Sequence, residues 1–255
     1  MKNVSKLLLK LIEDTLDNNG FDFENEINNM GHMVNIELRN RGKKFSFNEH
    51  LEGLIFSLLS NQRPWEPIRK NKEKIKEIFY NFNKEKILNT DKEVFVEKLK
   101  EIKCGNRAIK KQMESLNYNI GVLNRIEKDF DSLDKFVTNL SPHNIAKELA
   151  SGDKYKLKQI GYALAFEYLR NVGIDAVKPD THIIRILSNK RLGYSSSTPT
   201  PEEAVEILEY ISRETGFSLS YIDALLWNFC ASGYGDICTK EPKCKICKLD
   251  SYCEF

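Results

Sequence analysis

The spacing of the cysteines constrains this chain more than any other feature. Four of the six cysteines fall within 16 residues, with five, two and five residues between successive members. These four are Cys238, Cys244, Cys247 and Cys253. The two-residue gap lets the middle pair bind one centre from a single tight turn, while the longer arms fold around it. The pattern therefore predicts a loop pinned by metal.

The expected compartment decides between disulfides and a metal site. The first 19 residues contain lysines and a leucine run, but Lys10 interrupts the run and acidic residues follow it. We read this segment as an amphipathic helix rather than an export signal, and expect a cytoplasmic protein whose cysteines bind metal. The single close pair favours an iron–sulfur cluster, because zinc ribbons usually carry two close pairs. A four-cysteine zinc site is the alternative. Cys230 follows an apolar helix and is expected to be a buried structural thiol.

Helical periodicity dominates the rest of the chain. Apolar residues recur at three- and four-residue steps over residues 68–82 and 205–211. Helix-start signals stand at Ser141-Pro142 and at Thr200-Pro201. Alternating strand patterns are scarce, so we expect an all-α fold with nine to eleven helices. No stretch approaches the roughly 20 apolar residues of a membrane span, which argues against a membrane partner.

Net charge does not reveal a partner. The 39 basic and 37 acidic residues leave a formal charge of +2, so any surface for nucleic acid must be local. The cysteine loop itself carries four lysines against Glu241 and Asp250. A rigid loop with this excess of positive charge can present cations to phosphates.

Taken together, the motifs resemble the helix-hairpin-helix DNA glycosylases of the endonuclease III branch, which carry a C-terminal four-cysteine, four-iron four-sulfur (4Fe-4S) cluster. The similarity covers roughly residues 48–255, and its motifs follow the family order. They are the helix at 54–62, the hairpin at 157–165, the Asp-Thr-His segment at 178–185, and the final helix and cluster at 222–253.

The resemblance implies a two-lobed, all-α helix-hairpin-helix architecture with the substrate cleft between the lobes. Residues 45–173 would form a helical barrel that contains the hairpin. Residues 1–44 and 174–255 would form a second helical domain that carries the iron–sulfur cluster loop.

The resemblance also implies a catalytic carboxylate. Breaking an N-glycosidic bond leaves positive charge on the sugar, which a nearby carboxylate stabilises. The matching residue is Asp180, for which the residues alone favour an ordinary helix N-cap and the resemblance favours catalysis. Bifunctional members place a Schiff-base lysine where this chain has Ala163, or Tyr162 under another gap placement. Neither side chain supplies an amine, so we expect little AP-lyase activity.

At the hairpin, Gly161 matches the second glycine of the family and is expected to approach a DNA phosphate. Gln159 replaces the first glycine, and Lys158 replaces a proline while offering an ionic contact to DNA. If the position of Gln159 requires a positive φ, the turn is strained by about 1 kcal/mol. Tyr162 is a candidate for both DNA contact and the wall of the base pocket, and Ala163 is a further pocket candidate.

Other DNA contacts are implied around the helix that ends in Gln62, whose side chain would fill the stack vacated by a flipped base. Arg63 is expected to contact the strand, and Arg107 lies in a basic segment that resembles a phosphate-binding loop. Trp65 could line the base pocket by stacking or could cover the barrel core. Ser57 stands where the adenine-excising branch has a glutamate, which disfavours removal of mismatched adenine.

The leading hypothesis is a monomeric, monofunctional DNA N-glycosylase, a hydrolase of base excision repair associated with the nucleoid. Its partner would be double-stranded DNA with a damaged, mismatched or modified base. A second hypothesis is a catalytically inactive iron–sulfur DNA-binding protein. A third is a bifunctional glycosylase/lyase that uses a non-standard lysine, Lys156 or Lys158.

Overall fold

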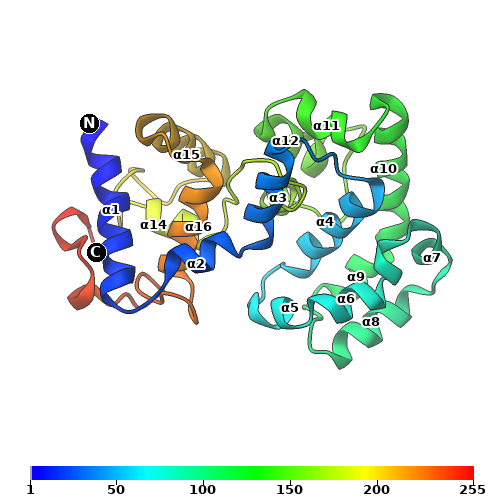
Figure 1. The fold of residues 1–255 in the computed structure, drawn as a ribbon, viewed down its shortest axis with the longest axis horizontal. Helices are drawn as coiled ribbons and strands as arrows, with labels where there is room; N and C mark the ends of the chain where they lie inside the picture. The colour runs from blue at the N-terminus through cyan, green and yellow to red at the C-terminus, as the bar shows by residue number, and fades with distance from the viewer. Residues whose placement is uncertain (1) are drawn as a thin grey trace. The chain divides into compact units, whose positions relative to one another are not determined.

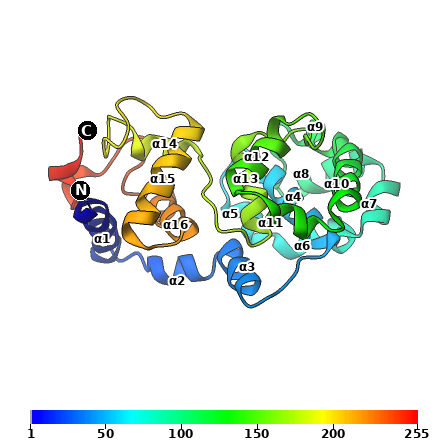
Figure 2. The ribbon, with the colours of Figure 1, turned by 90° about the horizontal axis from the view of Figure 1, so that it is seen from above.

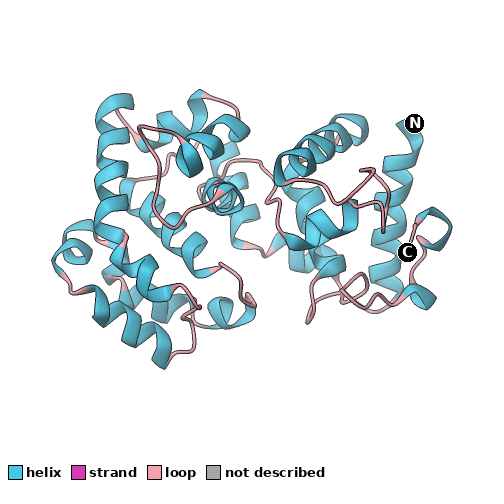
Figure 3. Cartoon of the chain, turned by 180° about the vertical axis from the view of Figure 1, so that it is seen from behind, coloured by secondary structure: helices cyan, strands magenta, loops and turns pink. Residues whose placement is uncertain are grey.

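The computed structural model describes residues 2–255, and this range contains helices and loops but no strand (Figure 3). The expected all-α class is therefore confirmed. The chain divides into two compact units. The barrel unit comprises Leu38–Ile174, and the cysteine unit comprises Met1–Glu37 with Asp175–Phe255. Among the helices of residues 2–255, none has both the length and the apolar character that a membrane crossing requires.

The helices of the barrel unit are short (Figure 1). They are α4 (Phe47–Leu59), α5 (Glu66–Lys70), α6 (Lys72–Ile78), the 3-10 helix η1 (Tyr80–Phe82), α7 (Lys84–Asn89), α8 (Lys92–Glu101), α9 (Ile109–Glu114), α10 (Leu116–Phe130), α11 (Leu133–Asn139), α12 (Pro142–Ser151) and α13 (Tyr162–Asn171). Helix α3 (Gly31–Asn40) crosses the boundary between the units.

The helices of the cysteine unit come from both ends of the chain. They are α1 (Lys2–Asn18), α2 (Phe23–Asn28), α14 (Thr181–Leu187), α15 (Pro201–Thr215), α16 (Leu219–Cys230), and the 3-10 helices η2 (Cys244–Ile246) and η3 (Asp250–Tyr252). The described residues thus hold sixteen α-helices. The expected nine to eleven was wrong because turns divide the periodic segments into pieces of five to seven residues.

Helix α4 forms the centre of the barrel unit. A capping box starts it, in which the Ser46 hydroxyl accepts from the Glu49 amide and the Glu49 carboxylate accepts from the Ser46 amide. Nine of its 13 residues are buried, which is the pattern of a helix surrounded by others. It packs on α13, which in turn packs on α12, and Figure 2 shows the other helices of the unit arranged around it.

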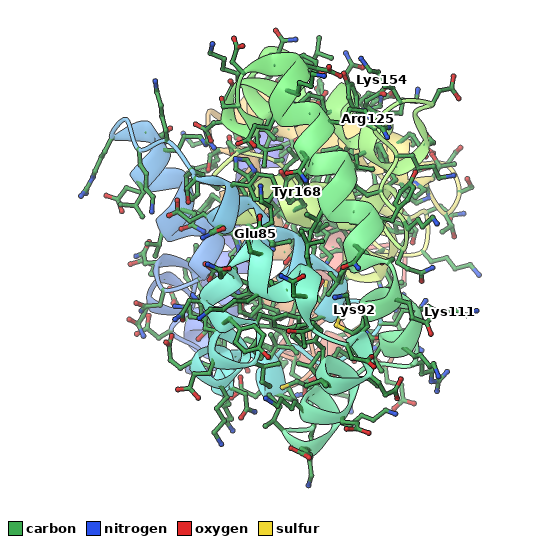
Figure 4. All side chains as sticks on the ribbon, turned by 90° about the vertical axis from the view of Figure 1, so that its right-hand side faces the viewer. Glu85, Lys92, Lys111, Arg125, Lys154 and Tyr168 are labelled. Atoms are coloured by element: carbon green, nitrogen blue, oxygen red, sulfur yellow. The ribbon has the colours of Figure 1, made fainter. Side chains whose placement is uncertain are left out.

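A buried polar network ties the barrel unit together. Asp134 on α11 accepts hydrogen bonds from Arg39 at 2.7 and 3.2 Å, and His50 on α4 lies 3.4 Å from the same carboxylate. The other ring nitrogen of His50 is 2.6 Å from the hydroxyl of Tyr168, which lies in the interior of the unit (Figure 4). Burial alone would raise the pKa of Asp134, but the hydrogen bonds from His50 and Arg39 outweigh it and hold that pKa well below its usual range.

This network explains where the barrel unit begins. Arg39 also donates to the carbonyl of Val172 at 2.7 and 2.9 Å, and the amide of Phe45 donates to Asp134 at 3.1 Å. The segment before α4 therefore belongs to the barrel unit, which starts at Leu38 rather than at the expected residue 45.

The core of the cysteine unit forms between α1, α15 and α16. Leu8, Leu9, Ile12 and Leu16 of α1 are buried, whereas Leu11 is half-buried, which is the one-sided burial of the amphipathic helix expected for this segment. Helix α16 is apolar along most of its length and is almost wholly buried, so it serves as the platform for the segments that surround it.

Candidate functional site

The first group of predicted site residues follows α4. The helix ends at Leu59, so the expectation that it ends in Gln62 was wrong by three residues. Gln62 instead lies in the following turn, with an exposed side chain and a left-handed backbone at φ +50°. An exposed amide at the tip of a turn can still enter a base stack, as the wedge role requires.

The side chain of Arg63 forms hydrogen bonds within the barrel unit. Its guanidinium donates to the carbonyls of Lys103 at 2.6 Å and Gly105 at 2.8 Å. The side-chain amide of Asn106 donates to the carbonyl of Leu58 near the end of α4 at 3.1 Å, so the loop after α8 is joined to this region at a second point. Arg63 therefore positions the turn that carries Gln62, and a direct contact between Arg63 and DNA stays a prediction.

The loop that Arg63 contacts leads into a basic surface. Arg107 is exposed, and it lines an open depression together with Lys110, Lys111 and Glu114. Figure 4 shows Lys111 projecting from the edge of the unit. Three cations against one carboxylate can hold a phosphate, in keeping with the expected role of Arg107.

Two side chains near α4 bear on the base pocket. Trp65 is half-buried and meets the buried ring of Phe56 edge-on at 6.4 Å between centroids, which favours a role in covering the core. Ser57 is fully buried, and its hydroxyl donates to the carbonyl of Gly53 at 2.7 Å. No carboxylate occupies this position.

The hairpin between α12 and α13 is held by a buried side chain that sequence reasoning missed. The oxygen of Asn119 accepts from the amide of Lys158 at 2.8 Å, and its nitrogen donates to the Lys158 carbonyl at 3.0 Å. Gln159 then adopts φ +62°, whereas Gly161 is extended at φ −93°. Gln159 therefore has the positive φ under which strain was expected at this position. The Lys158 ammonium lies 4.2 Å above the Tyr118 ring.

Tyr162 and Ala163 form the first turn of α13. The Tyr162 hydroxyl lies 2.7 Å from Nδ1 of His143, and its ring packs edge-on against Phe166 at 4.9 Å. Both Tyr162 and Ala163 are half-buried. The structure thus gives Tyr162 a fixed orientation and leaves a methyl group at the position after it.

Asp180 is the N-cap of α14, as predicted. Its Oδ1 accepts from the amides of His182 at 2.8 Å and Ile183 at 3.3 Å. The preceding segment is fixed to α16, because the amide of Lys178 donates to Asp223 at 2.8 Å. The carboxylate is half-buried at the N-terminus of α14.

Arg185, five residues further along, joins this helix to the start of the cysteine loop. Its Nη2 lies 3.1 Å from Nδ1 of His182 and donates to the carbonyls of Cys230 and Cys238 at 3.3 and 3.2 Å. Burial lowers the pKa of His182, so its ring is neutral near pH 7. The sequence offers no signal for these contacts, because they end on backbone carbonyls.

The four predicted ligands converge in the cysteine unit. Cys238, Cys244, Cys247 and Cys253 line one cavity that is partly open to solvent. The loop is anchored by the amide of Cys238, which donates to the carbonyl of Phe229 at 2.9 Å. Further along, the amide of Lys248 donates to Thr15 of α1 at 3.1 Å, and Figure 1 shows the loop beside α1. Gly235 is required here, since a Cβ would lie 2.8 Å from the Asn228 carbonyl oxygen.

The chemistry of these thiols suits a soft metal centre. All six cysteines are free thiols. Burial, with smaller effects from the neighbouring thiols, raises the pKa of Cys247 to about 11. A hydrogen bond from Cys230, together with Arg191, lowers the pKa of Cys238 to about 7. Four thiolates in one apolar cavity need a cationic ligand to be ionised together. Within the described side chains, no three such donors are grouped to hold a single ion.

No protein-family model matches the chain. Solved structures do resemble it. The 8-oxoguanine glycosylase/lyase of Methanocaldococcus jannaschii, in complex with a 15mer DNA containing 8-oxoguanine, aligns with a TM-score of 0.58 and 23% identity over 88% of this chain and 96% of that chain. The 8-oxoguanine DNA glycosylase of Thermotoga maritima gives 0.61 and 21% over 88% and 99%. This chain has the helix-hairpin-helix DNA glycosylase fold.

A second structure of the Methanocaldococcus jannaschii 8-oxoguanine DNA glycosylase shares 25% identity with this chain, at a TM-score of 0.58 over 86% of this chain and 93% of that one. Among curated proteins, the 8-oxoguanine DNA glycosylase/AP lyase of Aquifex aeolicus is 36% identical over 89 residues. That match spans 32% of this chain and 39% of the relative's length. In the glycosylase fold of this chain, α12 and α13 form the hairpin.

Proposed function

We propose that this protein is a DNA glycosylase of base excision repair that extrudes an oxidised purine from double-stranded DNA and hydrolyses its N-glycosidic bond. 8-Oxoguanine is the first candidate base, because the similar proteins are named for it. The observation that carries the proposal is the half-buried Asp180 carboxylate at the start of α14, in a chain with the helix-hairpin-helix glycosylase fold.

In the proposed reaction, the bond between the base and C1′ of the sugar breaks, and the base leaves with the bonding electrons. The Asp180 carboxylate stabilises the positive charge that develops on the sugar and accepts a proton from the attacking water. The water oxygen bonds to C1′, and the base acquires a proton. Gln62 occupies the vacated stack, and the hairpin and Arg107 hold phosphates.

The enzyme is proposed to be monofunctional, although the relatives include enzymes named as lyases. Support comes from Ala163, which has no amine, and from the Lys158 ammonium, which rests on the Tyr118 ring. A Schiff base needs a neutral amine beside C1′. A lyase that recruits Lys156 or Lys158 is the competing possibility, and a borohydride trap distinguishes the two.

The four cysteines are proposed to hold a 4Fe-4S cluster. Support comes from the cavity lined by all four thiols and from their spacing, in which only one close pair occurs. When bound, the cluster supplies the fixed geometry of the loop. Anaerobically purified protein should hold about four irons and absorb broadly near ~400 nm. Stoichiometric zinc without iron would overturn this assignment.

Base excision is tested with a panel of lesion duplexes that begins with 8-oxoguanine opposite cytosine. Free base is detected by mass, and strand cleavage is expected only after alkali. Asp180→Asn should lower excision by roughly 10³-fold while DNA binding persists. Asp91→Asn is the matched control, because Asp91 is also an N-cap but lies at the start of α8.

The outcomes separate the competing functions. Excision that is lost in Asp180→Asn and kept in Asp91→Asn supports the proposal. Equal excision by Asp180→Asn and the unmodified protein removes Asp180 from the mechanism. Tight duplex binding with no base released from any lesion favours the non-catalytic DNA-binding protein.

A further inference from the structure

The cavity of the four cysteines is bordered by a buried cation. Arg191 lies in the loop that follows α14, lines the cavity and is 6% exposed. Its Nη1 donates to the carbonyl of Lys190 at 2.8 Å. Its Nε is buried and has no hydrogen-bond partner among the described residues. A buried guanidinium with an unused donor is unfavourable unless a negative group faces it.

The segment after Cys253 covers this arginine. The amide of Glu254 donates to the Arg191 carbonyl at 2.8 Å, and the ring of Phe255 stacks on the guanidinium at 4.1 Å. The side chain of Phe255 is 66% exposed, and its ring shields one side of the arginine from water. Shielding of this kind strengthens the interaction of the guanidinium with charge inside the cavity.

No carboxylate forms an ion pair with Arg191 in the part of the chain that the structure describes, and the cavity that Arg191 lines is shared with the four cysteines. An iron–sulfur cluster held by four thiolates is negative overall and gains one more negative charge on reduction. Nearby positive charge therefore favours both its retention and its reduced state.

We propose that Arg191, shielded by Phe255, is the positive charge that retains the cluster and sets its reduction potential. This inference rests on the proposed cluster. Arg191 contacts the cluster environment from outside the four ligands, so it is a positioning and tuning residue rather than a ligand.

The test compares four proteins purified anaerobically: the unmodified chain, Arg191→Met, Arg191→Lys and Lys190→Met. Lys190 is the matched control, because it is the adjacent residue, carries the same charge and is exposed. Iron per chain, the midpoint potential from a redox titration followed by electron paramagnetic resonance, and the rate of iron release to a chelator are measured.

Arg191→Met is expected to shift the midpoint potential to a more negative value and to speed iron release by about tenfold. Arg191→Lys should keep the potential close to that of the unmodified protein, because the charge is preserved. Lys190→Met should match the unmodified protein in both measurements. Phe255→Ala should shift the potential in the same direction as Arg191→Met but by less, since water then reaches the guanidinium.

The results distinguish this inference from the cluster assignment. An unmodified protein without iron overturns both. An unmodified protein with about four irons, together with an Arg191→Met variant of unchanged potential and iron release, overturns only the role of Arg191. An equal shift of the midpoint potential in Lys190→Met also overturns the role of Arg191, because the shift then follows from the net charge of the protein and not from the position of Arg191. If Arg191→Met does not fold, Phe255→Ala decides, and an unchanged potential in that variant counts against the inference.

Discussion

The hairpin of the barrel unit and the loop of the cysteine unit are both irregular segments to which function is assigned, but they are fixed by different means. Asn119 brackets the hairpin with two hydrogen bonds to Lys158, and α12 and α13 hold its two ends. The cysteine loop has only short 3-10 turns, and its four thiols face a shared cavity. The hairpin of the barrel unit is held by protein side chains, whereas the cysteine loop surrounds a cavity lined by its four thiols, where we propose a bound cluster.

The buried charges differ in the same way. In the barrel unit, Asp134 is neutralised by Arg39 and bonded to His50, so that network is complete within the protein. In the cysteine unit, the buried Arg191 borders the cavity of the four cysteines and forms no ion pair with a carboxylate of the described residues. Variants in the two units should therefore respond differently to the presence of metal.

The largest effect is expected for Cys247→Ala, which removes a ligand from the tight turn. Loss of the bound group should release iron and lower the free energy of unfolding by several kcal/mol, because binding energy at such a site is folding energy. Cys104→Ala is the control, since this buried thiol lies in the barrel unit. It should lose about 1 kcal/mol and keep its iron. Denaturant unfolding and iron analysis measure both, and equal iron in the two variants would contradict the comparison.

Asp134→Asn should follow, with a loss of about 3 kcal/mol near pH 7, because it leaves the half-buried guanidinium of Arg39 without its ion-pair partner. The folded-state pKa of Asp134 is held below its usual range. Its contribution is therefore complete above the unfolded pKa of about 4 and disappears as the pH falls below that value.

The difference in unfolding free energy between Asp134→Asn and the unmodified protein should be constant from pH 5 to pH 8, roughly, and should narrow in stronger acid. Asp131→Asn, which breaks an exposed ion pair with Lys135, should change stability little. A pH-independent gap down to about pH 2 would show that charge is not the cause.

Asn119→Ala should lower stability by about 2 kcal/mol, since it removes two hydrogen bonds to the hairpin backbone. It should also weaken binding to duplex DNA, because the hairpin amides lose their orientation. Asn124→Ala, on the exposed face of the same helix, controls for the loss of an asparagine in α10. Fluorescence anisotropy with labelled duplex tests the binding, and equal affinities for the two variants would remove Asn119 from this role.

The smallest effect is expected for Gln159→Gly, which should raise the unfolding free energy by up to about 1 kcal/mol. Gln159 holds φ +62°, a conformation that glycine adopts without a steric penalty. Gln159→Ala keeps the Cβ and should show no such gain. A destabilised glycine variant would indicate that the glutamine side chain stabilises the hairpin and offsets the strain.

Local patterns made part of this architecture predictable. The all-α class follows from periodicity, the N-cap at Asp180 from the residues around it, and the convergence of the cysteines from their spacing. The end of α4 was placed three residues too late, because the turn after Leu59 carries no glycine or proline before Gln62 and continues the polar pattern of a helix end.

Contacts between distant segments were not predictable from one sequence. Asn119 binds a backbone 39 residues away, and Arg185 binds a carbonyl 53 residues away. A side chain that bonds to a backbone group leaves no pattern in the residue it contacts. The same holds for η1, where Tyr80, Asn81 and Phe82 take positive φ although none is a glycine. Tertiary packing there overrides local preference.

The most direct test of the proposed chemistry is a borohydride trap during a single turnover on duplex DNA that contains 8-oxoguanine, with released base measured in parallel. The account predicts free base, an intact abasic strand and no covalent complex between protein and DNA. Ala163→Lys should gain a trappable complex under the same conditions, which shows that the trap works in this protein. A covalent complex formed by the unmodified chain would contradict the account, because an amine of this protein would then attack C1′.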